Sequence, residues 1–232
     1  MGAIVAIFDL DGTLYTGHVT KGIALHHQQH RVKRLPLYLY LITHVPLWYL
    51  RRAGIMSEAA LRELWVRNLG WTVRGWTPSE AAVAFTWITE QYVQPRLRLD
   101  VVARLTDHQA MGHRVILVSG TFSPLLAEVG RQLGVRETVG TPLLIRDGHY
   151  TGACEIPVCQ GPNKVLRLET YLHGSDDVEW SSSYAYADSY TDLPLLERVG
   201  HPVAAYPDSR LAAVALEREW EILGGEPTSV GR

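Results

Sequence analysis

Short apolar runs that stop abruptly at polar residues recur along the chain and alternate with segments of helical periodicity. Apart from Arg114 and Ser183, which begin two of them, residues 4–8, 114–118, 183–187 and 203–206 are runs of apolar, aromatic or β-branched residues that are too short for buried helices. Such runs are typical of strands in a parallel sheet that is covered on both faces. Because helical stripes lie between them, the pattern predicts an α/β fold with a doubly wound, Rossmann-like, mostly parallel sheet.

Helical stripes follow the strands, and glycines mark two of their ends. Residues 99–111 form a stripe that ends at Gly112, and Leu126, Val129 and Leu133 form one that stops at Gly134. Further helices are predicted from Lys164 and around residues 211–215. Outside these, we expect a hairpin over 143–152 as a side flap on the core, an edge strand over 221–223 and a loose tail over 224–232.

The separation between the first two strands is far longer than a crossover helix requires, which predicts an inserted domain. We assign residues 17–95 to a helical cap and residues 1–16 and 96–232 to the α/β core. Two apolar stripes with helical spacing support this division, formed by Leu61, Leu64, Trp65 and Asn68 and by Ala81, Phe85, Ile88 and Tyr92. The second helix has a clear start, because Thr77 and Glu80 are spaced for a capping box.

The segment 31–52 places an aromatic-rich apolar run between two basic clusters. The run over 35–50 is shorter than the roughly 20 residues that span a bilayer, and it contains Pro36, His44 and Pro46. We expect its side chains to build the core of the cap or a wall of the substrate site. The alternative is an interfacial helix on a membrane surface, since Trp48 and the tyrosines suit a headgroup layer.

Composition narrows the class of protein. The chain has 232 residues, 47% of them hydrophobic, which is enough for one substantial core, and its net charge of −2 disfavours a nucleic-acid partner. Cys154 and Cys159, the only cysteines, indicate neither a disulfide framework nor a zinc site. The first residues show no signal peptide, so we expect a cytoplasmic protein with a small-molecule substrate. Nothing in the composition defines an oligomeric state.

Candidate chemistry begins where the first strand ends. Asp9 and Asp11 follow the apolar run 4–8 directly, in the stretch Asp-Leu-Asp-Gly-Thr. Ligands of open α/β sheets bind at the carboxyl ends of the strands. Two carboxylates so close together repel each other unless they share a cation or a proton. The alternative is a strand followed by an ordinary polar turn.

Asp-Leu-Asp-Gly-Thr resembles the first motif of the haloacid dehalogenase-like superfamily, and matches to the other motifs follow in order along nearly the whole chain. Ser119 ends the strand over 114–118, Lys164 opens a helix, and Asp188 and Asp192 follow the strand over 183–187. The resemblance is greatest to the phosphoserine phosphatase-like branch (subfamily IB), whose helical cap closes over the active site. Closure would exclude water before phosphoryl transfer.

The resemblance implies a Mg²⁺-dependent phosphomonoester hydrolase that works through an aspartyl-phosphate. Asp9 matches the nucleophile and Asp11 the general acid and base. Asp9, Asp188 and the backbone carbonyl of Asp11 match the Mg²⁺ ligands, all of them hard oxygen donors. A non-catalytic phosphate-binding module would be expected to lack the nucleophile, and Asp9 is present.

The remaining roles also come from the resemblance. Ser119 and the backbone amides of Leu10 and Gly120 match the donors to the substrate phosphate, and Lys164 matches the cation that offsets its charge. Asp192 matches the acid that holds a metal-bound water or Lys164 in place. For Thr13 we expect a structural role, in which it satisfies backbone groups in the turn.

One feature bears on substrate specificity. His18 occupies the position where members that hydrolyse phosphoserine carry a glutamate for the ammonium group, which implies a small or medium phosphomonoester other than phosphoserine. A phosphoserine phosphatase is the alternative.

His26, His27 and His30 could share a helix face and bind a transition metal, but no carboxylate or cysteine is suitably spaced. We therefore expect a solvated helix face there.

Overall fold

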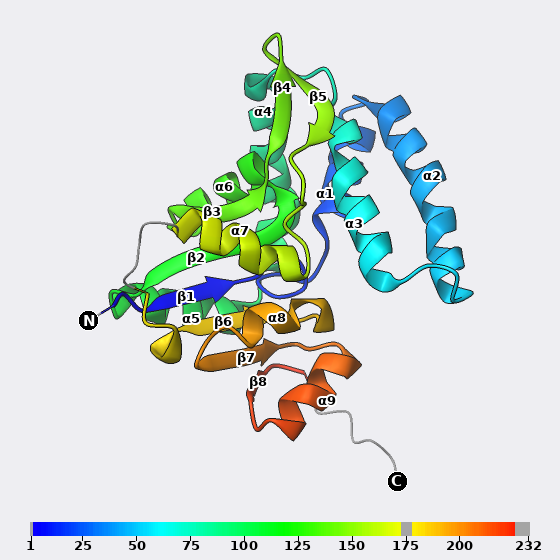
Figure 1. Cartoon of the computed structure of the whole chain (residues 1–232). Helices are drawn as coiled ribbons and strands as arrows, with labels where there is room; N and C mark the ends of the chain where they lie inside the picture. Colours follow the sequence, from blue (N-terminus) through cyan, green and yellow to red (C-terminus); the bar gives the residue numbers. More distant parts are fainter. Residues whose placement is uncertain (1, 173–177, 226–232) are drawn as a thin grey trace.

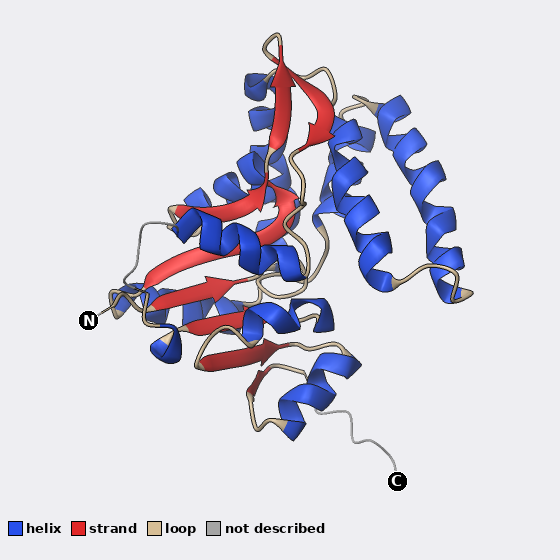
Figure 2. Cartoon of the chain, in the orientation of Figure 1, coloured by secondary structure: helices blue, strands red, loops and turns tan. Residues whose placement is uncertain are grey.

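A six-stranded, entirely parallel sheet forms the core of the protein (Figure 2), which confirms the predicted doubly wound α/β class. The computed structural model describes residues 2–172 and 178–225. The strand order is β3-β2-β1-β6-β7-β8. The strands are β1 (Val5–Phe8), β2 (Arg114–Phe122), β3 (Glu137–Thr141), β6 (Tyr184–Ala187), β7 (His201–Ala205) and β8 (Glu221–Leu223).

Alternate residues of the strands supply the two halves of the core. Ala6 and Phe8 of β1 pack with α5 (Leu99–Ala110) and α6 (Ser123–Gln132) on one face of the sheet. Val5 and Ile7 face the opposite layer, made of α7 (Pro162–Leu172), α8 (Leu193–Leu196) and α9 (Ser209–Glu217). Since both faces are covered, all four residues of β1 are buried. A continuous apolar run is the pattern that such a central strand requires.

Two strands differ from the sequence prediction. β2 continues past Ser119 to Phe122, with an irregular register against β3 between Val118 and Phe122, so Ser119 lies within the strand and the next helix begins at Ser123. β3 was not predicted, because its sequence Glu-Thr-Val-Gly-Thr contains one large apolar residue and no apolar run. Its place at the sheet edge, beside β2, explains why so little hydrophobicity suffices.

Four helices make up most of the segment between β1 and α5. They are α1 (Val19–Gln29), α2 (Arg34–Arg52), α3 (Glu58–Leu69) and α4 (Pro78–Ile88). α4 starts with the predicted capping box, in which Thr77 and Glu80 satisfy each other's backbone N–H groups. Figure 1 shows α2 and α3 standing side by side at one end of the molecule, away from the sheet.

The predicted hairpin exists, but it lies against the helical insert rather than only on the core. β4 (Leu143–Arg146) and β5 (His149–Cys154) form a separate two-stranded antiparallel sheet. Tyr150 exchanges two backbone hydrogen bonds of 2.8 Å with the turn between α3 and α4: its carbonyl accepts from Gly75, and its N–H donates to Trp76. The hairpin therefore braces that turn.

The histidines of α1 correct one expectation. His26 and His27 are buried, with their Nδ1 atoms 3.1 Å apart, and His27 Nε2 lies 2.8 Å from the carbonyl oxygen of Thr72. Burial, together with the nearby His27, lowers the pKa of His26 to about 4. The expected solvated face is wrong for these two residues, because the rings of Trp76 and Trp87 pack over them. His30 is exposed.

Other expectations are resolved more simply. Cys154 and Cys159 are buried free thiols. β8 is the predicted edge strand, and the expected loose tail lies outside the described residues apart from Gly224 and Gly225.

Within the described part of the chain, no helix has the length and apolar character needed to cross a bilayer. The segment 31–52 divides between two environments: Leu37, Tyr40 and His44 of α2 are buried, whereas most of its other apolar side chains are exposed.

Candidate active site

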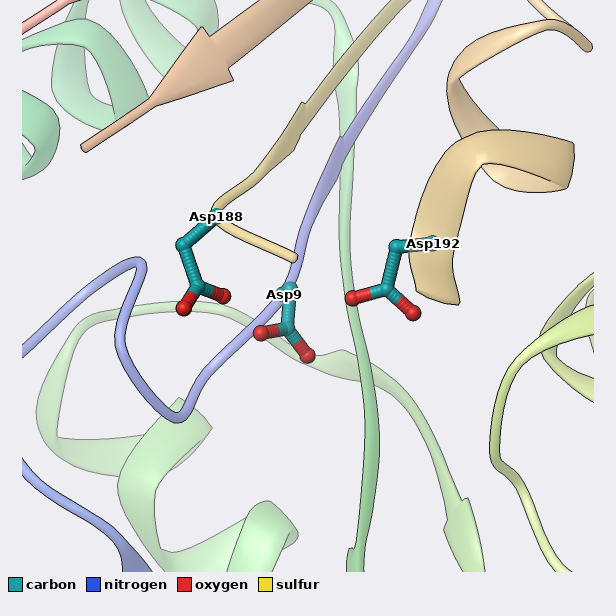
Figure 3. Close-up of side chains that lie close together, drawn as sticks. All are labelled: Asp9, Asp188 and Asp192. Atoms are coloured by element: carbon teal, nitrogen blue, oxygen red, sulfur yellow. The ribbon is translucent and has the colours of Figure 1, made fainter. Parts of the chain in front are cut away.

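Three carboxylates converge at the carboxyl ends of the central strands β1 and β6. Asp9 directly follows β1, Asp188 follows β6, and Asp192 closes the short 3₁₀ turn after it. Each contributes one oxygen to a group of three atoms that lie within 4.8 Å of one another. Figure 3 shows the three side chains close together. Neighbouring parallel strands end at the same sheet edge, which is why acids far apart in the sequence meet here.

Gly12 allows the chain to turn beneath this group. Its φ of +87° lies in the left-handed region that favours glycine. A Cβ atom at this position would lie 2.2 Å from Asp188 Oδ2. The glycine of the first motif is therefore required both by the backbone conformation and by the close approach of a carboxylate.

Lys164 joins two of the three acids. Its Nζ donates to Asp9 Oδ1 at 2.6 Å and to Asp192 Oδ2 at 2.9 Å, and its side chain is 3% exposed. Burial alone would lower the pKa of this lysine, but the charges of Asp192 and Asp9 outweigh it and raise the pKa. Lys164 is therefore a fixed positive charge, which explains why a cation is found in the first turn of α7 against the helix dipole.

Asp11 occupies a different environment from the other acids. The Tyr15 hydroxyl donates to its Oδ1 at 2.5 Å, and the backbone N–H of Val19 donates to the same oxygen at 3.1 Å. Desolvation is the main cause that raises its pKa to about 7; the hydrogen bond from Tyr15 opposes this, and the charge of Asp9 adds to it. An acid with such a pKa can both donate and accept a proton near neutrality.

Thr13 has a structural role, as expected, but its hydrogen-bond partners differ from the predicted ones. Its hydroxyl faces the acids rather than the turn backbone, 3.3 Å from Asp9 Oδ2 and 3.2 Å from Asp188 Oδ1. Since the residue is fully buried, these two carboxylates are the partners available to its hydroxyl. The threonine therefore orients two of the site's acids.

The predicted phosphate-binding residues lie on β2 and just after the end of the adjacent strand β1. Ser119 is buried and lines the pocket above the acids, where its Oγ accepts from the N–H of Thr121 at 3.3 Å. The carbonyl of Gly120 accepts from Thr141 Oγ1 at 2.9 Å, which fixes the orientation of the peptide plane after it. Leu10 is fully buried, with its backbone between Asp9 and Asp11.

The acid group suits a hard divalent cation. Asp192 Oδ1 is a buried oxygen that has no hydrogen-bond partner among the described residues, and such a group is costly unless something satisfies it. All the acids nearby offer carboxylate oxygens, the donors that Mg²⁺ prefers. Desolvation and the charges of Asp9 and Asp192 raise the pKa of Asp188 to about 8. Lys164 alone therefore does not neutralise the negative charge of the three acids.

We predict that Mg²⁺ stabilises the fold more at about pH 8 than at about pH 5. Folding raises the pKa values of Asp11 and Asp188 from 3.8 to about 7 and about 8, so the folded chain holds protons that the unfolded chain has released. The metal-free protein should therefore lose stability as the pH rises through this interval, and Mg²⁺ should replace the protons. Thermal melting in EDTA and in Mg²⁺ at both pH values tests this; an equal gain at both would contradict it.

A pocket of about 580 Å³ opens over the acids towards the helical insert. The predicted core residues that line it are Asp9, Asp11, Ser119, Gly120, Lys164, Asp188 and Asp192. Leu10 and Thr13 do not line it. Its far wall comes from α1, α2 and α3 and contains His18, Leu41, Trp48, Leu61 and Trp65. The insert thus supplies an apolar and aromatic wall.

Sequence reasoning missed a charged cluster in that wall. Glu58 accepts from Arg51 at 3.1 Å and from Arg62 at 3.1 Å, and Arg210 lies 3.7 Å away. The spacing of Glu58 and Arg62 by four residues in a predicted helix was visible in the sequence. The pairing with Arg51, which comes from another helix, was not.

The fold and the acid constellation define the class of protein. Residues 6–197 match the family of haloacid dehalogenase-like hydrolases, and the chain belongs to this family.

Individual relatives are consistent with this assignment. A probable phosphatase of Mycobacterium tuberculosis is 30% identical over 149 residues, which are 64% of this chain and 51% of that protein. A phosphoserine phosphatase of the same species is 29% identical over 222 residues, covering 94% and 69% of the two chains. The chain spans about half the length of the first of these relatives. A Bordetella pertussis protein of unknown function has a similar crystal structure, with a TM-score of 0.80, 26% identity, and coverage of 97% and 99%.

Proposed function

We propose that this protein is a Mg²⁺-dependent phosphomonoester hydrolase that forms an aspartyl-phosphate on Asp9. The observation that carries the proposal is the buried contact of Asp9 with Lys164 at 2.6 Å, with Asp188 and Asp192 beside it and Asp11 at the pocket floor. Phosphoryl transfer depends on alignment and on neutralising charge, and this arrangement supplies both. The names of the mycobacterial relatives support the same reaction class.

In the first half-reaction, a carboxylate oxygen of Asp9 attacks phosphorus and the bond from phosphorus to the ester oxygen breaks. Asp11 gives its proton to the leaving oxygen. Ser119, Lys164 and the amides of Leu10 and Gly120 hold the phosphoryl oxygens. A bound Mg²⁺, held by Asp9, Asp188 and the carbonyl of Asp11, would neutralise phosphate charge in this step.

In the second half-reaction, a water molecule attacks the phosphorus of the aspartyl-phosphate and Asp11 takes its proton. The bond from phosphorus to Asp9 breaks, which releases inorganic phosphate and restores the carboxylate. A pKa of about 7 lets Asp11 act first as an acid and then as a base near neutral pH. Tyr15 and the N–H of Val19 hold the carboxyl group in position for both steps.

The helical insert acts as the cap. In this proposal, residues 17–95 cover the pocket and exclude water during the first step, and residues 1–16 and 96–232 carry the chemistry. Support comes from the pocket wall, in which α1, α2 and α3 face the acids of the core. Val66 of α3 also lies close to Gly120 of the core, since a Cβ atom added to Gly120 would lie 3.1 Å from the Val66 side chain.

The pocket favours a substrate other than phosphoserine. Among the described residues that line it, Glu58 is the one carboxylate outside the catalytic group, and Arg51, Arg62 and Arg210 already surround it. Lys21 adds a further positive charge to the wall. An ammonium group would therefore be desolvated without an anionic partner, whereas Trp48 and Trp65 offer surface to an apolar or aromatic leaving group.

We expect wild type to hydrolyse phosphoserine about a hundredfold less efficiently, in kcat/KM, than an aromatic phosphomonoester. His18 lines the pocket, and desolvation together with Lys21 and Arg62 lowers its pKa, so it offers no negative charge to an ammonium group. His18→Glu should improve phosphoserine selectively. His18→Gln is the matched control without charge. A wild-type preference for phosphoserine, or an equal change for both substrates, would show that His18 does not face the leaving group.

Phosphate release from a panel of phosphomonoesters, with Mg²⁺ and with EDTA, tests the proposed reaction as a whole. We expect turnover that requires the metal and favours apolar or aromatic leaving groups over phosphoserine. Absence of phosphate release from every phosphomonoester in the presence of Mg²⁺ would contradict the proposal.

A further inference from the structure

The outer face of α2 is an unusually apolar exposed surface. Leu35, Tyr38, Leu39, Ile42, Val45 and Tyr49, which we call the outer face, are all exposed, and Ile42 is 69% exposed. Their spacing of three and four residues places them on one side of the helix, opposite the buried Leu37, Tyr40 and His44. Figure 1 shows α2 at the periphery of the molecule, with α3 beside it.

Positive charge frames this surface at both ends. Arg31 and Arg34 stand at the start of α2 and Arg52 at its end, whereas Lys33 and Arg51 are held within the chain by the Arg74 carbonyl and by Glu58. The sequence contains no Asp or Glu between Asp11 and Glu58. Arg34 in the first turn opposes the helix dipole, and Lys33 at the N-cap, with a φ of 46°, makes no side-chain capping hydrogen bond. Lys33 donates to the Arg74 carbonyl at 2.8 Å, whereas Arg31 and Arg34 are exposed and do not stabilise the helix through its dipole.

We propose that the outer face of α2 docks the protein on an anionic lipid surface. Apolar side chains between basic flanks, with tyrosines and a tryptophan, are what an interfacial helix presents to a headgroup layer. Trp48 is partly exposed, and the Arg52 guanidinium lies 5.6 Å from its ring centre, so aromatic and cationic groups occur together at one end.

A second copy of the chain is a poorer occupant. If two outer faces paired antiparallel, the basic start of one α2 would meet the basic end of the other, and a parallel pairing would bring like ends together. Either arrangement places like charges opposite each other at an apolar contact, which costs free energy. Anionic headgroups complement both ends at once.

Docking has a consequence for the pocket. Leu41 and Trp48 of the same helix line the pocket above the acids. A lipid surface on the outer face would therefore lie on the opposite side of α2 from the pocket. The docking itself does not depend on the proposed reaction, because binding to lipid is measured without substrate.

Co-sedimentation with vesicles tests the proposal. We expect the protein to pellet with vesicles of equal parts phosphatidylcholine and phosphatidylglycerol, to remain in solution with phosphatidylcholine alone, and to be released by high salt. Ile42→Asp should weaken the partition at least about tenfold. Val83→Asp is the matched control, because Val83 is 72% exposed on α4 and lies outside the outer face. The double variant Arg34→Gln/Arg52→Gln should also bind these vesicles more weakly, because it removes two positive charges and leaves the apolar outer face unchanged.

Several results would overturn the proposal. Binding of Ile42→Asp that equals wild type, an equal loss in Val83→Asp, or equal binding to both vesicle types would each do so. Light scattering after size exclusion provides a further test: if wild type is a dimer that Ile42→Asp converts to a monomer, and neither binds vesicles, the face contacts a second copy instead. Thermal melting shows whether each variant is folded, and Ile42→Ser replaces Ile42→Asp if the latter is not.

Discussion

Replacement of Asp9 by asparagine is expected to lower kcat by a factor on the order of 10⁴ or more, because an amide cannot form the aspartyl-phosphate. The fold should survive the change. Asparagine keeps the shape of the side chain and relieves repulsion with Asp188, although it weakens the contact with Lys164. Turnover of p-nitrophenyl phosphate and thermal melting, measured on the same preparation, separate the chemical loss from a structural one.

A matched variant controls for the loss of one carboxylate. Asp147 is exposed in the hairpin turn with a φ of 50°, a conformation that asparagine adopts readily. Asp147→Asn should therefore keep both activity and stability. Substantial turnover in Asp9→Asn would remove the nucleophile assignment, whatever the melting temperature.

Replacement of Lys164 by methionine is expected to have the largest effect on stability, a loss of about 3–5 kcal/mol in the free energy of unfolding near neutral pH. Methionine fills a similar volume, but it leaves Asp9 and Asp192 without the ammonium that now lies 2.6 Å and 2.9 Å from their oxygens. The loss should shrink at low pH. Burial already raises the pKa of Asp192, so protonation can neutralise the group once the lysine is gone.

Two comparisons make this prediction specific. Denaturant unfolding in EDTA, so that no metal substitutes for the lysine, should show much of the lost stability restored by adding Asp192→Asn to Lys164→Met. Lys21→Met, which removes an exposed lysine, should change stability little. A Lys164→Met variant as stable as wild type would mean that the buried ion pairs are not a net stabilising feature.

The residues of the pocket floor were predicted from the resemblance of four short motifs and from their order along the chain. Asp9, Ser119 and Asp188 each follow or belong to an apolar run that can only be a buried strand, and parallel strands bring such positions to one edge. Lys164 was predicted from the resemblance, because a lysine near a helix start is by itself most often a surface residue, although the helix dipole disfavours it there. Chain order was enough to place these motifs at one edge of the sheet because the core repeats a regular β-α unit.

The wall of the site could not be predicted in this way. The ion pair of Glu58 with Arg51 depends on how α2 packs beside α3, and helical periodicity does not fix that packing. The burial of His26 and His27 likewise depends on Trp76 and Trp87, which come from other segments. The hydrogen bond from Tyr15 to Asp11 arises within four residues, but nothing in the local pattern distinguishes Tyr15 from the other tyrosines.

The most direct measurement is the mass of the peptide that contains Asp9 after reaction with p-nitrophenyl phosphate in the Asp11→Asn variant. Nitrophenolate leaves without needing a proton, so Asp9 should still be phosphorylated, whereas the water that releases phosphate has lost its base. The expected result is an acid-stable, hydroxylamine-sensitive phosphoryl group on Asp9, absent when Asp9→Asn is added. Phosphate release by the Asp11→Asn variant with no phosphorylated peptide, or phosphorylation of another residue, would contradict the mechanism.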